Sequence, residues 1–278
     1  MKIHFYGTGA SEGVPALFCE CENCRRMRRL GGKNLRTRTG AKVDEELLID
    51  FSADTYAHVL YGGLDLTKIN YLLVTHSHED HLYSSDLMTL KPPMAFYERE
   101  RSLAVYGNEK TAWKIRREME KYGRSPEEVS KYVRIHEIAP YEKQQIGEYE
   151  VIPLPANHDK QENCLIYVIG RGGKYLLYGH DTAMFAEEAW QALKQYRFDC
   201  VILDCTMVEE TGIFPEHMGL PDNILIRERM LKEHMASEQT KFIATHFTHI
   251  YNPEHERITP LFAEKGLITA YDGMEVEF

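Results

Sequence analysis

Four side chains that commonly bind metal ions lie within one short stretch of the chain. The apolar run Ile69–Val74 leads directly into Thr75-His-Ser-His-Glu-Asp-His81. An apolar run of this length is typical of a buried strand, so the polar stretch is expected to be a loop at the strand's end. A tight turn there can direct nitrogen and oxygen donors at two divalent ions. The four side chains are those of His76, His78, Asp80 and His81.

Three more residues of the same kind follow apolar runs elsewhere in the sequence. Each alone is weak evidence, because a lone histidine is more often structural than a ligand. Together with the loop they supply five histidines and two carboxylates, enough for two metals that each keep an open position, as catalytic sites do. They are His158 after residues 151–155, Asp181 after residues 175–178 and His246 after residues 242–245.

The remaining sequence predicts an α/β protein. The chain has 278 residues, 43% of them hydrophobic, which is enough for a sizeable core. No repeat or linker marks a boundary, so residues 1–278 are expected to form a single domain with mixed sheets. Strands are predicted near 2–6, 43–50, 69–75, 102–106, 149–154, 164–169, 174–179, 199–204, 241–245 and 273–278. Helices are predicted near 53–61, 110–122, 126–132, 185–196, 221–236 and 254–265.

Composition excludes several classes of protein. No apolar run approaches the roughly 20 residues of a membrane-spanning helix, and no signal peptide is visible, so a cytoplasmic location is expected. A net charge of −10 argues against a general nucleic-acid coat but leaves room for a small anionic substrate. The basic residues between Arg25 and Lys42 could contact such a substrate or RNA, although most charge runs are simply solvated.

Half of the six cysteines lie within six residues, at Cys19, Cys21 and Cys24. In a cytoplasmic chain this spacing favours metal binding over disulfides. The other three lie in apolar, strand-like runs and are expected to be buried thiols. They are Cys164, Cys200 and Cys205.

Taken together, these motifs resemble the metallo-β-lactamase superfamily over nearly the whole chain. The matching features are Gly7-Thr-Gly9, the histidine loop, and then His158, Asp181 and His246 in the family's order. The resemblance implies an αββα sandwich, with mixed sheets, helices on both outer faces and metals between the sheet edges.

The resemblance also implies which residues hold each metal. One metal would be held by His76, His78 and His158, the other by Asp80, His81 and His246, and Asp181 would bridge them. Redox members of the superfamily place glutamate where this chain has His78, so redox use is not expected. The two catalytic metals are expected to be Zn²⁺ first, with Mn²⁺ or iron as alternatives that the same donors suit.

A narrower resemblance begins at Gly13-Val-Pro-Ala-Leu-Phe-Cys-Glu-Cys-Glu-Asn-Cys24, which is similar to the phosphoribosyl cyclic phosphate phosphodiesterases. It implies a zinc-binding loop at about 13–30, in which Cys19, Cys21, Cys24 and His249 hold a structural Zn²⁺. Three thiolates and one imidazole make a closed tetrahedral site. The ending Tyr271-Asp-Gly-Met-Glu275 also resembles that family.

The expected activity is that of a metal-dependent phosphoric diester hydrolase acting on a small cyclic or nucleotide-like phosphodiester. A hydroxide held between two metals would attack phosphorus in line, with Asp80 orienting it. His217, just ahead of the helix predicted at 221–236, would donate a proton to the leaving alkoxide. The resembling family keeps an active-site histidine there, although a capping histidine is the alternative.

Other functions remain open at this stage. Within the superfamily they are an RNA-processing nuclease of the tRNA 3′-end type and a thioester or lactone hydrolase. A catalytically silent metal-binding scaffold is the non-enzyme alternative, and a complete ligand set argues against it. The expected partner is a small anionic phosphodiester, with nucleic acid less favoured and no membrane. The resemblance is compatible with a homodimer.

Overall fold

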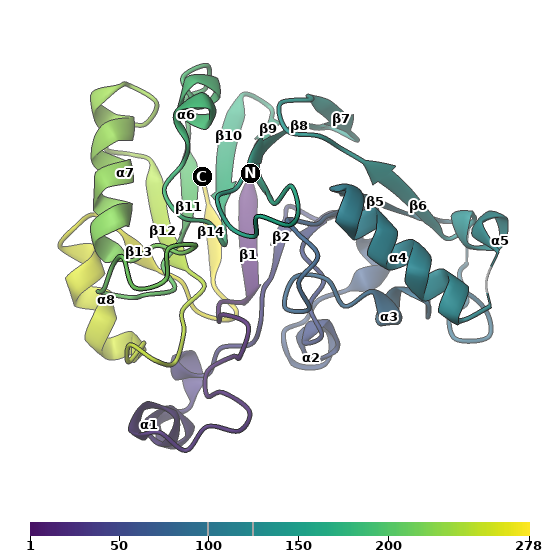
Figure 1. The fold of residues 1–278 in the computed structure, drawn as a ribbon, viewed down its shortest axis with the longest axis horizontal. Helices are drawn as coiled ribbons and strands as arrows, with labels where there is room; N and C mark the ends of the chain where they lie inside the picture. The colour runs from purple at the N-terminus through teal and green to yellow at the C-terminus, as the bar shows by residue number, and fades with distance from the viewer. Residues whose placement is uncertain (99, 124) are drawn as a thin grey trace.

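A computed structural model describes residues 1–98, 100–123 and 125–278, and it contains two seven-stranded sheets (Figure 1). The strands of the first sheet, in spatial order, are β14 (Glu275–Glu277), β1 (Lys2–Gly7), β2 (Gly40–Val43), β3 (Leu47–Ile49), β4 (Tyr71–Leu73), β5 (Leu103–Gly107) and β6 (Val133–Glu137). Those of the second are β13 (Ile268–Thr269), β12 (Lys241–Thr245), β11 (Cys200–Asp204), β10 (Lys174–Gly179), β9 (Leu165–Arg171), β8 (Tyr149–Pro155) and β7 (Gln144–Ile146).

Both sheets are mixed, as the sequence predicts. In the first sheet β3 to β6 are parallel, and the strands from β14 to β3 are antiparallel. In the second, β10 to β13 are parallel, and β7 to β10 are antiparallel. Because parallel strands end at the same edge of a sheet, the loops after β3, β4, β10, β11 and β12 are free to converge.

Strand β9 shows why the chain folds into layers. Leu165, Tyr167 and Ile169 point into the core between the two sheets, while Ile166 and Val168 point into the core beneath the helices of the second sheet. Side chains of a strand alternate between its faces, so a strand that is buried on both faces is apolar throughout. The αββα sandwich predicted from the sequence is confirmed.

Helices cover both outer faces (Figure 1). Side chains of α3 to α5 join the core of the first sheet, and α2 lies on the same side. Side chains of α6, α7 and α8 join the core of the second sheet. The helices of the first side are α2 (Thr55–Tyr61), α3 (Ser84–Leu87), α4 (Glu109–Lys121) and α5 (Pro126–Ser130), with a 3-10 turn at Leu66–Lys68. Those of the second are α6 (Glu187–Leu193), α7 (Leu220–Lys232) and α8 (His255–Ala263).

Two features of the N-terminal quarter differ from the sequence prediction. The strand predicted near 43–50 is a hairpin of β2 and β3, and its turn begins at Asp44, which has φ 50°. A helix that was not predicted, α1 (Glu22–Leu30), follows the cysteine loop and is followed by a 3-10 turn at Gly32–Asn34. Figure 1 shows α1 standing apart from both sheets. Across the described residues, no helix has the length and apolar character needed to cross a membrane.

Candidate metal centre and its cavity

The loops after four strands bring the predicted catalytic ligands together. The loop after β4 carries His76, His78, Asp80 and His81, and the loops after β8, β10 and β12 carry the other three residues. Seven residues spread over 171 positions of sequence therefore meet in two groups of neighbouring donor atoms. In each group the donor atoms lie within 4.8 Å of one another.

The first group is formed by three imidazoles, those of His76, His78 and His158. His78 Nδ1 lies 3.0 Å from His76 Nε2 and 3.3 Å from His158 Nε2. His76 is buried, whereas His78 is exposed. This group matches the first ligand set that the resemblance implies.

The second group contains Asp80, His81, Asp181 and His246, all of which are buried. Asp80 Oδ2 lies 3.3 Å from His81 Nε2 and 3.7 Å from His246 Nε2. Burial alone would raise the pKa of Asp80, but the imidazoles of His81 and His246 hold it well below its usual range. Asp80 is therefore an anion in a buried site, as a metal-binding carboxylate must be.

Asp181 lies where the two groups meet. Its Oδ2 is 3.4 Å from His76 Nε2 and 3.5 Å from His158 Nε2, both in the first group. The same oxygen is 3.0 Å from His81 Nε2 in the second group. One carboxylate is thus within reach of both groups, which is the position that a bridging ligand requires.

The chemistry of the donors fits divalent metals. His81 Nε2 and His246 Nε2 are buried and make no hydrogen bond within the described structure, although carboxylate oxygens lie nearby. Buried polar atoms without a partner are rare in folded proteins, and an absent ion is one explanation for them. Imidazole and carboxylate donors suit zinc, manganese and iron alike.

Asp50, which was not predicted from the sequence, holds the histidine loop in place through hydrogen bonds. It follows β3 and is 1% exposed. Its carboxylate accepts hydrogen bonds from Thr75 N at 2.8 Å and lies 2.8 Å from His81 Nδ1. A carboxylate on the second nitrogen of a ligand histidine fixes the orientation of the ring. The pattern Leu47-Leu-Ile-Asp50, an apolar run that ends in a carboxylate, is the signal that could have revealed it.

Asp204 plays a similar part on the second sheet and was also missed. It ends β11, is fully buried, and accepts a hydrogen bond from Thr206 N at 2.9 Å. Thr206 Oγ1 in turn lies 2.8 Å from His246 Nδ1. The chain Asp204–Thr206–His246 therefore holds the ring of His246 in place.

His217, the predicted proton donor, lies beside these groups. Its Nδ1 is 3.0 Å from Asp181 Oδ1 and 3.0 Å from Asp204 Oδ2. Burial would lower the pKa of His217, but the two carboxylates outweigh it and raise the pKa to about 11. His217 thus lies beside the second group, and the N-cap of α7 is Gly219.

Three residues of this region have left-handed backbone conformations that are uncommon for residues other than glycine. Asp50 has φ 62°, Asp181 has φ 53° and His246 has φ 65°. Asp50 and His246 lie directly after a strand, and Asp181 lies two residues beyond β10, so the backbone turns sharply at these strand ends and directs the side chains to the shared edge. Such backbone strain clusters at functional sites.

His180 adds a further imidazole next to the second group. It is 1% exposed, and its ring centroid lies 4.7 Å from that of His246. Burial and the neighbouring imidazoles of His246 and His81 hold its pKa well below the usual range. A neutral, buried ring in this position packs against the ring of His246.

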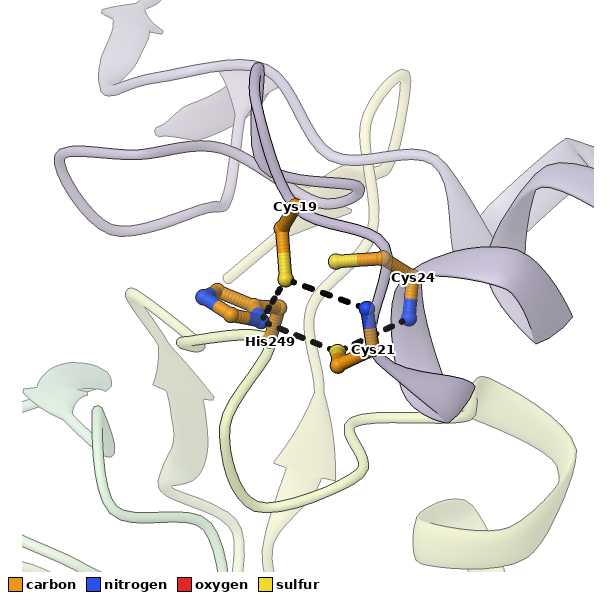
Figure 2. A group of neighbouring side chains, drawn as sticks. All are labelled: Cys19, Cys21, Cys24 and His249. Atoms are coloured by element: carbon orange, nitrogen blue, oxygen red, sulfur yellow. Dashed lines mark hydrogen bonds between the residues drawn. The ribbon is translucent and has the colours of Figure 1, made fainter.

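The three clustered cysteines and His249 form a separate group (Figure 2). His249 Nδ1 lies 3.8 Å from Cys19 Sγ and 3.6 Å from Cys21 Sγ. Bond lengths of about 2.3 Å to sulfur and 2.0–2.1 Å to nitrogen place the ligands of a tetrahedral zinc about 3.6 Å apart, so these separations fit such an ion. The N–H of Cys24 and the ring of His249 outweigh burial and lower the pKa of Cys21 to about 6, which favours the thiolate.

The group joins distant parts of the chain. Cys21 is the N-cap of α1, and His249 lies in the loop after β12, three residues beyond His246. Asn23 Nδ2 strengthens the junction by donating to His249 O at 2.9 Å. The other three cysteines are buried and free, as expected.

A cavity of about 370 Å³ opens onto the second group. Its walls come from the N-terminal loop, from the segment before α7 and from the loop after β12. They include Asp80, Asp181, His217 and His246, together with Glu12, Glu216, Phe214 and Ile250.

Comparison with known proteins gives one family and several likenesses. The beta-lactamase superfamily domain matches residues 46–247. Among curated proteins, the octanoyltransferase of Porphyromonas gingivalis is 27% identical over 293 residues, which cover 99% of this chain and 51% of that protein. The chain spans about half the length of the curated relatives that it matches.

Two solved structures extend the comparison. A diphosphatase from the PhnP family has a TM-score of 0.74 and 23% identity, with 100% of this chain and 97% of that chain covered. The short form of human tRNase Z has a TM-score of 0.68 and 15% identity, with 100% and 99% covered. At these identities the likeness shows a shared fold.

Proposed function

The chain belongs to the beta-lactamase superfamily, and from this premise we propose that it is a metal-dependent hydrolase of small phosphodiesters. The observation that carries the proposal is the position of Asp181, whose carboxylate contacts imidazoles of both donor groups beside the cavity. Two adjacent metal positions suit phosphoester hydrolysis, because the charge of the reacting phosphoryl group is spread over several oxygens.

The proposed ligands divide as the two groups do. His76, His78 and His158 would hold one metal, Asp80, His81 and His246 the other, and Asp181 would contact both. When bound, two divalent cations would supply positive charge to the phosphoryl oxygens and make a water molecule more acidic. Zinc is the first expectation, because imidazole and carboxylate are its usual donors in catalytic sites.

Asp80 has a second task in this proposal. It lines the cavity, and its carboxylate is anionic at neutral pH because neighbouring imidazoles keep its pKa low despite burial. A carboxylate can only accept hydrogen bonds, so Asp80 would hold a water molecule with its hydrogen directed at Oδ and a lone pair free.

His217 would supply the proton that the leaving alkoxide needs. Its Nδ1 faces Asp181 and Asp204, and these carboxylates raise the pKa of the ring to about 11, so the ring carries its proton at neutral pH. Because Nδ1 is engaged by the carboxylates, Nε2 is the nitrogen available to a substrate in the cavity. Proton donation of this kind contributes about 10²–10⁴-fold in rate.

The size of the cavity supports a small substrate. A volume of about 370 Å³ lies in the range of pockets that bind metabolites. A cyclic sugar phosphate or a nucleotide fits such a volume, whereas a folded RNA would enter only by one end. Because the fold is also similar to that of tRNase Z, an RNA-processing nuclease is the second candidate function to be tested.

A panel of substrates tests the proposal. Metal-loaded protein, with its metal content measured, would be assayed on a bis-aryl phosphate, on 2′,3′-cyclic nucleotides, on a thioester, on a lactone and on a small tRNA precursor. Turnover of the small diesters without cleavage of the RNA supports the proposal. Cleavage of the RNA alone would favour the nuclease, and turnover of the thioester or lactone alone would favour that hydrolase. A fully loaded protein that turns over nothing would indicate a silent metal-binding scaffold.

A further inference from the structure

Part of the cavity wall is acidic, because two glutamates line it in addition to the proposed metal ligands. Beyond the proposed ligands and His217, its charged lining consists of Glu12 and Glu216. None of the described residues that line it is a lysine or an arginine. The protonated ring of His217 is already paired with the carboxylates of Asp181 and Asp204, so a second anionic group of a substrate would find no unpaired positive side chain among the described lining residues.

Glu12 is held in a defined position on this wall. Thr248 Oγ1 donates a hydrogen bond to Glu12 Oε1, and Ser11 Oγ donates to Glu12 Oε2 at 3.3 Å. His249 Nε2 lies 3.8 Å from Oε1, while the other nitrogen of the same ring faces the cysteine sulfurs. One imidazole thus connects the cysteine group to the cavity wall. The Glu12 side chain remains 29% exposed, so it can still meet a ligand.

None of the arginines between residues 25 and 42 lines this cavity, and three of them pair or bond within the fold. Arg26 pairs with Glu254 at 2.5 Å, and Arg38 pairs with Asp54 at 2.6 Å. Arg36 is buried and donates to Ala270 O at 2.6 Å. The guanidinium groups of these three residues are thus engaged within the fold.

We propose that the part of the substrate that enters this cavity carries hydroxyl groups and no second phosphate, and that Glu12 accepts a hydrogen bond from one of these hydroxyls. The inference rests on the proposed function and narrows its substrate class to a sugar or polyol diester. A carboxylate accepts hydrogen bonds but cannot donate them, which suits a hydroxyl. A second phosphate would bring negative charge next to the carboxylates of Glu12 and Glu216, and like charges across a binding surface disfavour binding. The inference therefore excludes a phosphorylated sugar or a diphosphate as the substrate.

The test compares two stable probes that differ only by the remote phosphate, ribose 1-phosphate and ribose 1,5-bisphosphate. Calorimetry on the metal-loaded protein should give a Kd at least about 10-fold lower for the monophosphate, the equivalent of about 1.4 kcal/mol. In Glu12→Gln this preference should fall by about 5-fold or more, because the amide removes the negative charge at constant size. Glu264→Gln, at the exposed end of α8, is the matched control and should keep the preference.

The outcomes separate this inference from the proposed function. Equal or tighter binding of the bisphosphate by the wild-type protein would overturn the inference. A preference that Glu12→Gln leaves unchanged would overturn the assignment to Glu12. Turnover of a bis-aryl phosphate is measured alongside, and its absence in metal-loaded protein would count against the proposed function whatever the calorimetry shows.

Discussion

The imidazole of His217 faces the carboxylate of Asp204, with Nδ1 3.0 Å from Oδ2. Asp204 is fully buried at the end of β11, whereas the His217 side chain is 19% exposed at the cavity. The pair therefore connects a rigid strand end to the place where a substrate would lie. A histidine held in this way keeps one ring orientation, so its far nitrogen has a fixed direction.

Replacing His217 tests whether it donates a proton. His217→Ala is expected to lower kcat on a phosphodiester with a poor leaving group by about 10²–10⁴-fold, with the metal content unchanged. Steady-state kinetics and elemental analysis would measure both. His234→Ala, which removes an exposed histidine, should behave as wild type. A wild-type rate in His217→Ala would remove His217 from the mechanism.

Replacing Asp204 tests the pair itself. Asp204→Asn removes the charge that helps to keep the His217 ring protonated and oriented. The loss of kcat is expected to be at least about 10-fold for an alkyl diester and smaller for a nitrophenyl diester, whose leaving group needs no proton. Equal losses on both substrates would indicate a purely structural role for Asp204.

Asp181 is expected to be essential for metal retention. Asp181→Asn removes a charge that both donor groups contact, so the variant should lose most of the metal of the catalytic pair after dialysis. The zinc expected at the cysteine group, which does not include Asp181, serves as an internal control and should stay at one equivalent. Full metal content in Asp181→Asn would contradict the proposed bridging position.

The sequence predicts those residues of this site that stand in a recognisable motif or follow an apolar run as part of a larger set. The proposed ligands could be found because histidines and aspartates follow apolar runs within three residues, and the run length indicates strands that end together. Asp50 and Asp204 follow the same rule, but each is a single carboxylate without a neighbouring motif. Their role depends on hydrogen bonds to Thr75 and Thr206, which only the folded chain brings within reach.

The elements of the fold also differ in how well the sequence predicts them. The interior strands were predicted well, since burial on both faces leaves long apolar runs such as residues 164–169. Helix α1 was missed because only Cys24 and Met27 of its nine residues are buried, too few for a clear helical pattern. The hairpin at 40–49 was missed because its turn, Asp44-Glu-Glu46, interrupts the apolar pattern for only three residues.

The cysteine group is expected to hold one structural zinc. Cys24→Ser should lower the zinc content by one equivalent and lower Tm by several degrees, because the loop that carries α1 would lose its anchor to the β12 loop. Cys164→Ala, which alters a buried cysteine outside the group, should keep the full zinc content. Unchanged zinc in Cys24→Ser would contradict the assignment.

Acid should destabilise the fold partly through His58. Burial lowers the pKa of His58 to about 4, whereas an unfolded histidine titrates near 6.5. Between these values the unfolded chain binds a proton that the folded chain does not, so the free energy of unfolding falls as pH decreases. From pH 7 to pH 5 this contribution is about 2 kcal/mol. Urea unfolding at both pH values should show a smaller difference for His58→Gln. An equal difference in both proteins would show that His58 does not contribute.

The measurement that tests the central claim most directly is a metal titration of phosphodiesterase activity. Metal-free protein would first receive one equivalent of zinc, and hydrolysis of a bis-aryl phosphate would then be followed as zinc or manganese is added. The account predicts that activity rises until two further equivalents are bound and that Asp181→Asn stays inactive throughout. Activity that is independent of added metal, or equal in Asp181→Asn, would contradict it.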